Sequence, residues 1–294
     1  MRVLTAHLVV ALVALVVIGG ATRVMEAGLA CPDWPLCYGV LLPGRQMNLQ
    51  VFLEWFHRLD AFLVGITLLV LLTVSVWRRR RLPAWLPWAT LVAVGLVAFQ
   101  GVLGALTVTH LLASSTVTAH LATAFLLVLL LSGINQCLSQ APLPVPRPGW
   151  WPVIAIVTTG LVFAQCVLGG LMASQWAVEH CFQSGSQCEW VVRHRQWAQP
   201  AALAVLVLAA TTVFSPTTDA RSRSLSLGAA SLVGLQIVLG ILTLHWQLQK
   251  PLLTIGHQLI AALLMACLGA LCGRAFLASS QQSTSPSFEV TCGQ

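Results

Sequence analysis

The sequence predicts an all-α integral membrane protein, with eight transmembrane helices arranged as two pseudo-symmetric four-helix bundles and both termini in the cytoplasm. Its composition, eight long apolar runs and a repeat between its two halves together predict this fold. Of the 294 residues, 57% are hydrophobic and 8% are charged, whereas about 25% of the residues in a soluble globular protein are charged. This composition excludes an ordinary soluble enzyme, a nucleic-acid-binding protein and a disordered tail.

The first half of the chain contains four apolar runs, and a spanning helix needs about 20 such residues. The runs are 4–25, 51–77, 86–109 and 115–137. The first lies where a signal peptide would, but 19–23 is a poor cleavage site, so we expect a retained helix. Four consecutive arginines, 78–81, end the second run. Trp85 and Trp88 mark the start of the third, and a proline-rich segment, 142–148, follows the fourth.

The second half contains four further runs, 151–174, 194–214, 225–246 and 252–278. Tryptophans open the fifth run, as expected of the aromatic residues that gather at membrane interfaces. A charged loop, 219–223, separates the sixth run from the seventh. We therefore expect two four-helix domains, 1–140 and 141–278, followed by a mobile cytoplasmic tail over 279–294, which is rich in Ser and Gln.

The basic residues are divided unequally between the two sides of the predicted membrane. Nine lie on the side that holds both termini: Arg2, Arg78, Arg79, Arg80, Arg81, Arg147, Arg221, Arg223 and Arg274. Six lie on the other side: Arg23, Arg45, Arg58, Arg193, Arg195 and Lys250. Cytoplasmic loops carry an excess of Lys and Arg. The side with nine is therefore predicted to be cytoplasmic, and the net charge of +7 is assigned to membrane topology.

The two halves of the chain share a repeated pattern of residues. His57-Arg58 and His120 recur in the second half, at one common offset, as His194-Arg195 and His257. The motif Gln100-x3-Gly104-x-Leu106-Thr107 recurs at nearly the same offset as Gln236-x3-Gly240-x-Leu242-Thr243, and Gly19-Gly20 recurs at a larger offset as Gly169-Gly170. Because each half has four helices, the repeats are predicted to be parallel and related by an axis along the membrane normal.

Four of the eight histidines lie inside predicted helices and form two equally spaced pairs. The interval from His57 to His120 in the sequence equals the interval from His194 to His257. Ionisable residues inside a membrane are costly and are functional candidates. Each of the four lies near the outer end of its run, so we expect the members of a pair at similar depth on neighbouring helices. Four-helix bundles hold a haem between two axial imidazoles in this way.

Two other interpretations of these histidines stay open. Polar residues also hydrogen-bond between membrane helices without binding a cofactor, although a duplicated set of four at equal spacing favours haem. A metal ion other than haem iron is the second alternative. Two histidines in each bundle, with no nearby cysteine or carboxylate pair, are however few ligands for zinc.

Two pairs of cysteines enclose short loops on the predicted outer side. Cys31 and Cys37 lie in the first outer loop, and Cys181 and Cys188 lie in the third. Disulfides persist outside the cytoplasm, so we expect one disulfide in each loop. The alternative is two free or metal-binding pairs, and the sequence leaves open whether either disulfide is redox-active.

Only the first half carries carboxylates near its outer histidine. Glu54 lies three residues before His57, on the same helix face, whereas the equivalent position in the second half is Val191. A carboxylate in a partly apolar site can transfer protons or stabilise a cation; the alternative is an interfacial ion pair with Arg58. Arg58 and Arg195 directly follow histidines and are candidates for pairing with haem propionates, or for snorkelling to the interface.

The residues that carry these features resemble those of the bacterial heme A synthase family. Residues 19–23 and the stretch GLACPDWPLCYG over 28–39 resemble its first helix and first outer loop. Glu54-x-x-His57-Arg58 is similar to the family's Glu-x-x-His-Arg motif, and His120, His194 and His257 fall where its other histidines lie. The resemblance covers nearly the whole chain.

This resemblance implies an oxidoreductase that converts the C8 methyl group of haem O to a formyl group, giving haem A for terminal oxidases. His57 and His120 would be the axial ligands of the substrate haem O in domain 1–140. His194 and His257 would bind the iron of a haem b that relays electrons in domain 141–278. Glu54 would be the catalytic acid.

The resemblance also implies the setting of the protein. We expect a multi-pass protein of the bacterial inner membrane, surrounded by lipid, with the histidine sites towards the outer face. The expected partners are a farnesyltransferase that produces haem O and an electron acceptor such as a quinone. A homo-oligomer is compatible with the sequence, and no nucleic acid is expected.

Two other functions are weighed against this one. A bis-His di-haem cytochrome would pass electrons between quinol and an outer acceptor, but such a conduit usually places its haems near opposite membrane faces. A transporter would also fit a repeat, but transporters typically have helices broken at mid-depth, and few prolines lie inside the runs.

Overall fold

The computed structural model describes residues 1–139, 149–173 and 189–284, and these form eight α-helices. The helices are α1 (Arg2–Val24), α2 (Leu49–Trp77), α3 (Leu86–Thr109), α4 (Ser114–Cys137), α5 (Trp150–Met172), α7 (Glu189–Phe214), α8 (Ala220–His245) and α9 (Pro251–Thr284). All eight are long and apolar enough to cross a membrane. The predicted all-α fold with eight transmembrane helices is confirmed.

Five of the predicted runs agree with a helix to within three residues at each end, and three differ further at one end. Helix α7 begins five residues earlier than its run, because a Glu189–Arg193 ion pair one turn apart supports a polar first turn. Helix α8 also begins five residues early, because the Asp219 side chain caps it by accepting the Ser222 N–H at 3.1 Å. Helix α9 continues six residues beyond 278, through a polar segment without Gly or Pro.

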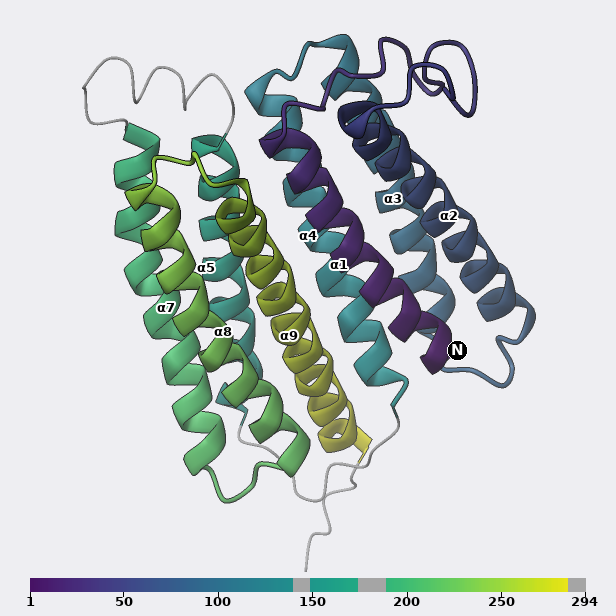
Figure 1. The fold of residues 1–294 in the computed structure, drawn as a ribbon. Helices are drawn as coiled ribbons and strands as arrows, with labels where there is room; N and C mark the ends of the chain where they lie inside the picture. Colours follow the sequence, from purple (N-terminus) through teal and green to yellow (C-terminus); the bar gives the residue numbers. More distant parts are fainter. Residues whose placement is uncertain (140–148, 174–188, 285–294) are drawn as a thin grey trace, which may run out of the picture.

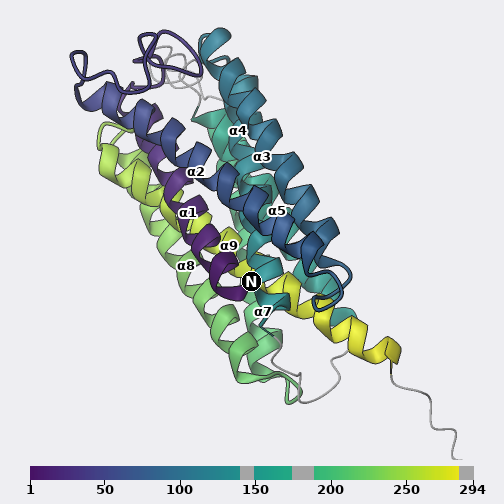
Figure 2. The same ribbon diagram turned by 90° about the vertical axis from the view of Figure 1, so that its right-hand side faces the viewer.

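The helices form two groups of four, which lie side by side in Figure 1; Figure 2 views the molecule from the side of the first group, with the second group behind it. In the first group α1 and α3 each contact both α2 and α4; in the second, α5 and α8 each contact both α7 and α9. Helix α9 also contacts α1, and α4 contacts both α9 and α5, so these helices join the groups. The N-terminus and the far end of α9 lie at the same end of the helices (Figure 1). The pseudo-symmetry axis and the side of the membrane that holds the termini remain predictions.

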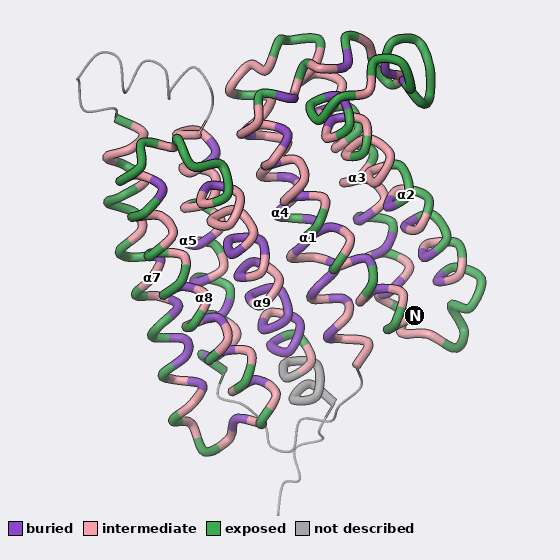
Figure 3. The backbone as a smooth tube through the Cα atoms, viewed as in Figure 1, coloured by how far each residue is buried: buried purple, intermediate pink, exposed green. Residues whose placement is uncertain are grey.

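The buried residues concentrate on α9 and on the helix faces that meet it. Leu264, Met265, Leu268 and Leu271 of α9 are at most 3% exposed. The outer faces instead carry large exposed apolar side chains, and Figure 3 shows these faces in green. A soluble protein rarely exposes so much apolar surface, whereas lipid tails cover it in a membrane protein.

Glycines allow α4 and α9 to approach each other closely. A Cβ atom at Gly269 would lie 2.5 Å from the carbonyl oxygen of Leu129, and one at Gly273 would lie 2.6 Å from that of Gly133. Gly269 and Gly273 are four residues apart, which is the small-xxx-small spacing of closely packed membrane helices. Backbone contact between α4 and α9 therefore fixes the two groups against each other.

The turns before α4 and α9 have the same backbone shape. Leu111 and Leu112 have φ angles of 48° and 60°, and Gln247 and Leu248 have 48° and 61°. The Leu112 N–H donates to the Thr107 carbonyl at 2.8 Å, and the Leu248 N–H donates to the Thr243 carbonyl at 3.0 Å. The repeated Leu-Thr motif thus ends α3 and α8 in the same way. The turn after α3 sets the start of α4, which carries His120, and the turn after α8 sets the start of α9, which carries His257.

Candidate functional site

The structure brings the four predicted histidines together as two opposed pairs. The ring centroids of His57 on α2 and His120 on α4 lie 6.4 Å apart with an interplanar angle of 68°. The centroids of His194 on α7 and His257 on α9 lie 6.5 Å apart at 74°. The pairing is as predicted, but the two helices of a pair stand at diagonal corners of their group rather than as neighbours. Each pair therefore faces across the centre of its four helices.

Each histidine ring lies against a glycine of an adjacent helix. A Cβ atom at Gly19 would lie 2.9 Å from Cε1 of His57, and one at Gly169 would lie 3.0 Å from Cε1 of His194. The corresponding distances are 3.6 Å for Gly104 and His120, and 3.1 Å for Gly240 and His257. Because glycine has no side chain, each repeated glycine leaves room for a histidine ring. This explains physically why the Gly-Gly and Gln-x3-Gly motifs carry a glycine at these positions.

Three of these glycines follow a glutamine by four residues, and that glutamine also contacts the histidine. The Gln100 amide donates to the His120 carbonyl at 2.9 Å, and the Gln165 amide donates to the His194 carbonyl at 2.8 Å. The Gln165 amide also lies 3.0 Å from Nδ1 of His194, and the Gln236 amide lies 3.1 Å from Nε2 of His257. Residues four apart share a helix face, so each Gln-x3-Gly motif holds one histidine.

His57 is the exception, because α1 has no glutamine at this position. Four residues before Gly19 stands Leu15, and a leucine side chain has no hydrogen-bonding group. The glutamines were missed by the sequence analysis as contacts of the histidines. The repeated Gln-x3-Gly spacing in 100–104 and 236–240 was the available signal, and 165–169 has the same spacing.

The donor set and geometry of both pairs fit a haem iron. With about 2 Å between a first-row metal and each imidazole nitrogen, two opposed rings have centroids about 6 Å apart, close to both observed separations. Among the described residues, Nδ1 of His57, of His120 and of His257 is buried without a hydrogen-bond partner. Within that same part of the chain, no three His, Cys, Asp or Glu side chains gather as metal ligands. Two opposed imidazoles suit an axial pair for haem better than a zinc site.

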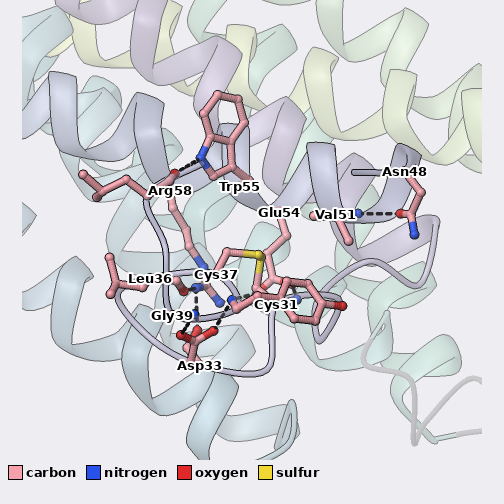
Figure 4. The surroundings of a disulfide bond; sticks show 12 residues. Cys31, Asp33, Leu36, Cys37, Gly39, Asn48, Val51, Glu54, Trp55 and Arg58 are labelled. Carbon is pink, nitrogen blue, oxygen red and sulfur yellow. Dashed lines mark hydrogen bonds and ion pairs between the residues drawn. A yellow bond between two sulfur atoms is a disulfide. The ribbon is translucent and has the colours of Figure 1, made fainter. Parts of the chain in front are cut away.

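The predicted acid, Glu54, is buried near the start of α2 and bonded to the loop that joins α1 to α2 (Figure 4). Its Oε2 accepts the Cys31 N–H at 2.8 Å, and its Oε1 pairs with Nη2 of Arg58 at 2.5 Å. Cys31 and Cys37 are joined by a disulfide in the structure. The carboxylate is therefore held by two donors, one from its own helix and one from the loop.

Arg58 and Asp33 fix the rest of this loop. Nη1 of Arg58 donates to the carbonyl oxygens of Asp33 and Leu36, at 2.6 and 2.5 Å. The Asp33 carboxylate accepts the backbone N–H groups of Tyr38 and Gly39, both at 2.7 Å. Arg58 thus connects α2, Glu54 and the loop. Its ion pair with Glu54 is the alternative that the sequence offered for that acid, whereas its bonds to the loop carbonyls were not predicted. Asp33 was missed as well, since its partners depend on the path of the loop.

The second group has no such arrangement among its described residues. Val191 stands at the place of Glu54 in the repeat, and the following Arg195 is exposed. Glu189 and Arg193 form an ion pair of the same i,i+4 spacing as Glu54 and Arg58, but both are exposed. The predicted disulfide between Cys181 and Cys188 lies outside the described residues.

Comparison with known proteins relates this chain to proteins of cytochrome oxidase assembly. The profile of the COX15-CtaA family, described as cytochrome oxidase assembly protein, matches residues 2–269. A protein of Sphingopyxis alaskensis named heme A synthase is 28% identical over 87% of this chain and 87% of its own length. One of Erythrobacter litoralis with the same name is 26% identical over 86% of this chain and 90% of its own. A third, from Shewanella oneidensis, is 30% identical over 56% of this chain and 54% of its own.

Proposed function

The chain belongs to the COX15-CtaA family of cytochrome oxidase assembly proteins, and from this membership we propose that it is a heme A synthase. The reaction is the oxidation of the C8 methyl group of haem O to a formyl group. The shared name of the relatives supports this proposal. The proposal makes the chain a membrane oxidoreductase that acts on a porphyrin substituent.

The observation that carries the proposal is a pair of similar histidine sites of which, in the part of the chain that the structure describes, only one has a buried acid on the helix of its first histidine. The separations of 6.4 and 6.5 Å suit the same kind of ligand at both sites. Glu54 lies on the helix of His57 and is bonded there to Arg58 and to the loop that carries the Cys31–Cys37 disulfide. A duplicated binding site with one specialised copy is what an enzyme needs when one haem reacts and another transfers electrons.

The residues divide accordingly between substrate and cofactor. His57 and His120 hold the substrate haem O, and His194 and His257 hold a haem b. When bound, haem b supplies one-electron transfer. The glycines opposite the rings orient each imidazole, and the glutamines of α3, α5 and α8 keep three of the four histidine helices in place.

Glu54 is the proposed catalytic acid, placed three residues before the ligand His57. Its bonds to the Cys31 N–H and to Arg58 hold the carboxylate in one position. A fixed carboxylate can stabilise positive charge that develops on a nearby substrate or accept a proton from it. The disulfide loop thereby serves as the support of the acid.

The proposed propionate contacts differ between the two arginines. Arg195 is exposed and follows His194, so it is the candidate that can turn to a haem b propionate. Arg58 already donates to Glu54 and to two loop carbonyls. It would reach a propionate of haem O only by exchanging one of these bonds, so its stronger proposed role is to hold Glu54 and the loop.

The proposed setting is the bacterial inner membrane, with the histidine sites towards its outer face. A farnesyltransferase that makes haem O would supply the substrate, and a membrane quinone would accept the electrons that the oxidation releases. A homo-oligomer is compatible with this arrangement.

Haem extraction from membranes tests the proposal directly. Cells that make haem O but no haem A are given this chain or an empty vector, and their extracted haems are separated by chromatography. Haem A that appears only with the chain supports the proposal. Bound haem b without any haem A would overturn it and favour a di-haem cytochrome, which needs the two histidine sites but not Glu54.

A further inference from the structure

We infer that Gln258 is a positioning residue that couples the two histidine pairs. From α9 of the second group it holds the segment of α1 on which the His57 ring lies. The inference rests on the proposed function in one respect, namely that the histidine pairs bind haem. Gln258 lies next to His257 of the second pair but acts on the helix that supports His57 of the first pair.

Gln258 directly follows His257 but contacts a different group of helices. Its Nε2 donates to the Val16 carbonyl of α1 at 2.9 Å. A Cβ atom at Gly20 would lie 2.4 Å from its Oε1 and 2.6 Å from its Cδ. The whole amide therefore lies on the α1 backbone. Because successive residues of a helix are about 100° apart, His257 and Gln258 can serve the two groups from one turn of α9.

The same turn of α1 carries the His57 ring. Val16 and Gly20 share the face that meets Gln258, since they are four residues apart. Gly19 lies on the adjoining face. Because it has no side chain, the His57 ring can lie against it: a Cβ atom at Gly19 would be 2.9 Å from Cε1 of His57. Any shift of this turn relative to α9 moves the backbone surface that orients His57.

The other three histidines differ from His57 in the side chain that supports them. Each is held by a glutamine of the helix that also provides its glycine. On α1 that position is Leu15. The helix that supports His57 instead receives its glutamine from α9, so the first site depends on the second group for its geometry.

The repeat supplies a matched comparison for this contact. Gly170 and Leu121 are the equivalents of Gly20 and Gln258, and they also meet: a Cβ atom at Gly170 would lie 3.2 Å from Cδ2 of Leu121. That contact, between α5 and α4, is apolar. The two halves therefore contain equivalent helix contacts, α9 with α1 and α4 with α5. Of these two, the contact with α1, the helix beside His57, is made by an amide side chain.

The test measures haem binding at each site separately. In the His194→Ala/His257→Ala background only the first site can bind haem, and in the His57→Ala/His120→Ala background only the second can. Gln258→Met keeps the length of the side chain and removes its hydrogen bond. Each full-length apoprotein is purified in detergent and titrated with haem b, and the dissociation constant is read from the Soret band.

We expect Gln258→Met to weaken haem binding at the first site about fivefold, the factor that one neutral hydrogen bond is worth. Binding at the second site should change less than twofold, although Gln258 adjoins the second-site ligand. The control Leu121→Met should change neither site by more than twofold. Equal weakening at both sites, weakening at the second site alone, or no weakening at the first would overturn the inference.

A second measurement keeps the inference separate from the proposed function. If the first-site background binds no haem, the proposed function fails, but the contact between α1 and α9 is still testable. Deuterium uptake by the α1 peptide that contains residues 15–20 should rise in the Gln258→Met apoprotein and stay unchanged in Leu121→Met. An unchanged uptake in Gln258→Met would overturn the inference whatever the haem result.

Discussion

Around the first histidine pair, a buried Glu54 is bonded to Arg58 and to the Cys31 backbone, whereas Val191 occupies the equivalent place beside the second pair. The supports of the rings differ less, because a glycine faces every one of the four histidines. The comparison teaches that duplication preserved the histidine pairs and their glycines, whereas the buried acid of the first half has no counterpart at position 191 of the second.

A second difference concerns how firmly the ligands are held. All four histidine rings are hydrogen-bonded to the backbone of the residue four positions before their glycine. In the second pair the side chains of Gln165 and Gln236 also reach ring nitrogens, whereas the Gln100 side chain reaches the His120 carbonyl and the Leu15 side chain has no hydrogen-bonding group. Hydrogen bonds to a metal-binding histidine fix its orientation and strengthen it as a ligand. The first pair therefore has fewer side-chain hydrogen bonds to its rings than the second, which agrees with the proposed division into a substrate that must leave and a cofactor that stays.

The largest expected effect comes from removing one ligand of each pair. His57→Ala should abolish haem A formation and leave haem b bound, because its pair would lose one of two axial ligands. His194→Ala should instead lose haem b and retain haem O. Chromatography of the extracted haems, together with spectra of the purified proteins, distinguishes these patterns. If both variants lose the same haem, the division into a substrate site and a cofactor site is wrong.

The next largest effect is expected at Glu54. Glu54→Gln keeps the shape of the side chain and removes its charge, so haem A formation should fall by about 10²- to 10⁴-fold, the usual contribution of a positioned acid or base. Haem O should remain bound at the first site. The measured quantity is the rate at which membranes convert haem O.

Glu189→Gln is the matched control for Glu54→Gln. It breaks an ion pair of the same spacing, with Arg193, in the other half of the chain, and the rate should be unchanged. Alkylation of free thiols shows whether the Cys31–Cys37 loop is still intact. Full activity of Glu54→Gln with an intact loop would reduce Glu54 to an anchor of that loop.

A smaller effect is expected from an ion pair that only the second group has. At the opposite end of the helices, Asp219 accepts a 2.7 Å bond from the buried Arg274 and caps α8 through Ser222. In the first group, the offset that relates the histidines places Leu82 and Cys137 at these two positions. Burial alone would raise the pKa of Asp219, but the hydrogen bonds from Arg274 and Ser222 outweigh it and lower the pKa to about 2.

This lowered pKa predicts a pH dependence of stability. The stabilising contribution of Asp219, about 2 kcal/mol, is complete above its ordinary pKa near 4 and is lost as the pH falls towards 2. The difference in Tm between the wild type and Asp219→Asn, measured in detergent, should therefore shrink between pH 4 and pH 2. A constant difference across this range would contradict the assigned cause.

The sequence predicted the helices and the pairing of the histidines well because both depend on local or repeated features. Hydropathy located eight helices, and equal spacing paired His57 with His120. It missed that the pair is diagonal, because the order of helices around a bundle is a tertiary property. It also missed the bond between Glu54 and the Cys31 N–H, since that contact depends on how a long loop folds back. The early start of α8 was missed because a cap, not hydropathy, sets it.

The smallest expected effect comes from exchanging the residues that support a ligand in each half. Leu15→Gln gives α1 the Gln-x3-Gly motif of the other three supports, and Gln165→Leu removes it from α5. A net hydrogen bond contributes about 1 kcal/mol. Leu15→Gln should therefore tighten haem at the first site about fivefold, and Gln165→Leu should weaken it at the second by a similar factor. Haem titrations of single-site backgrounds measure both. If Leu15→Gln also slows the release of haem A, the absence of a glutamine side chain beside His57 is a requirement of turnover; if release is unchanged, Leu15 has no part in it.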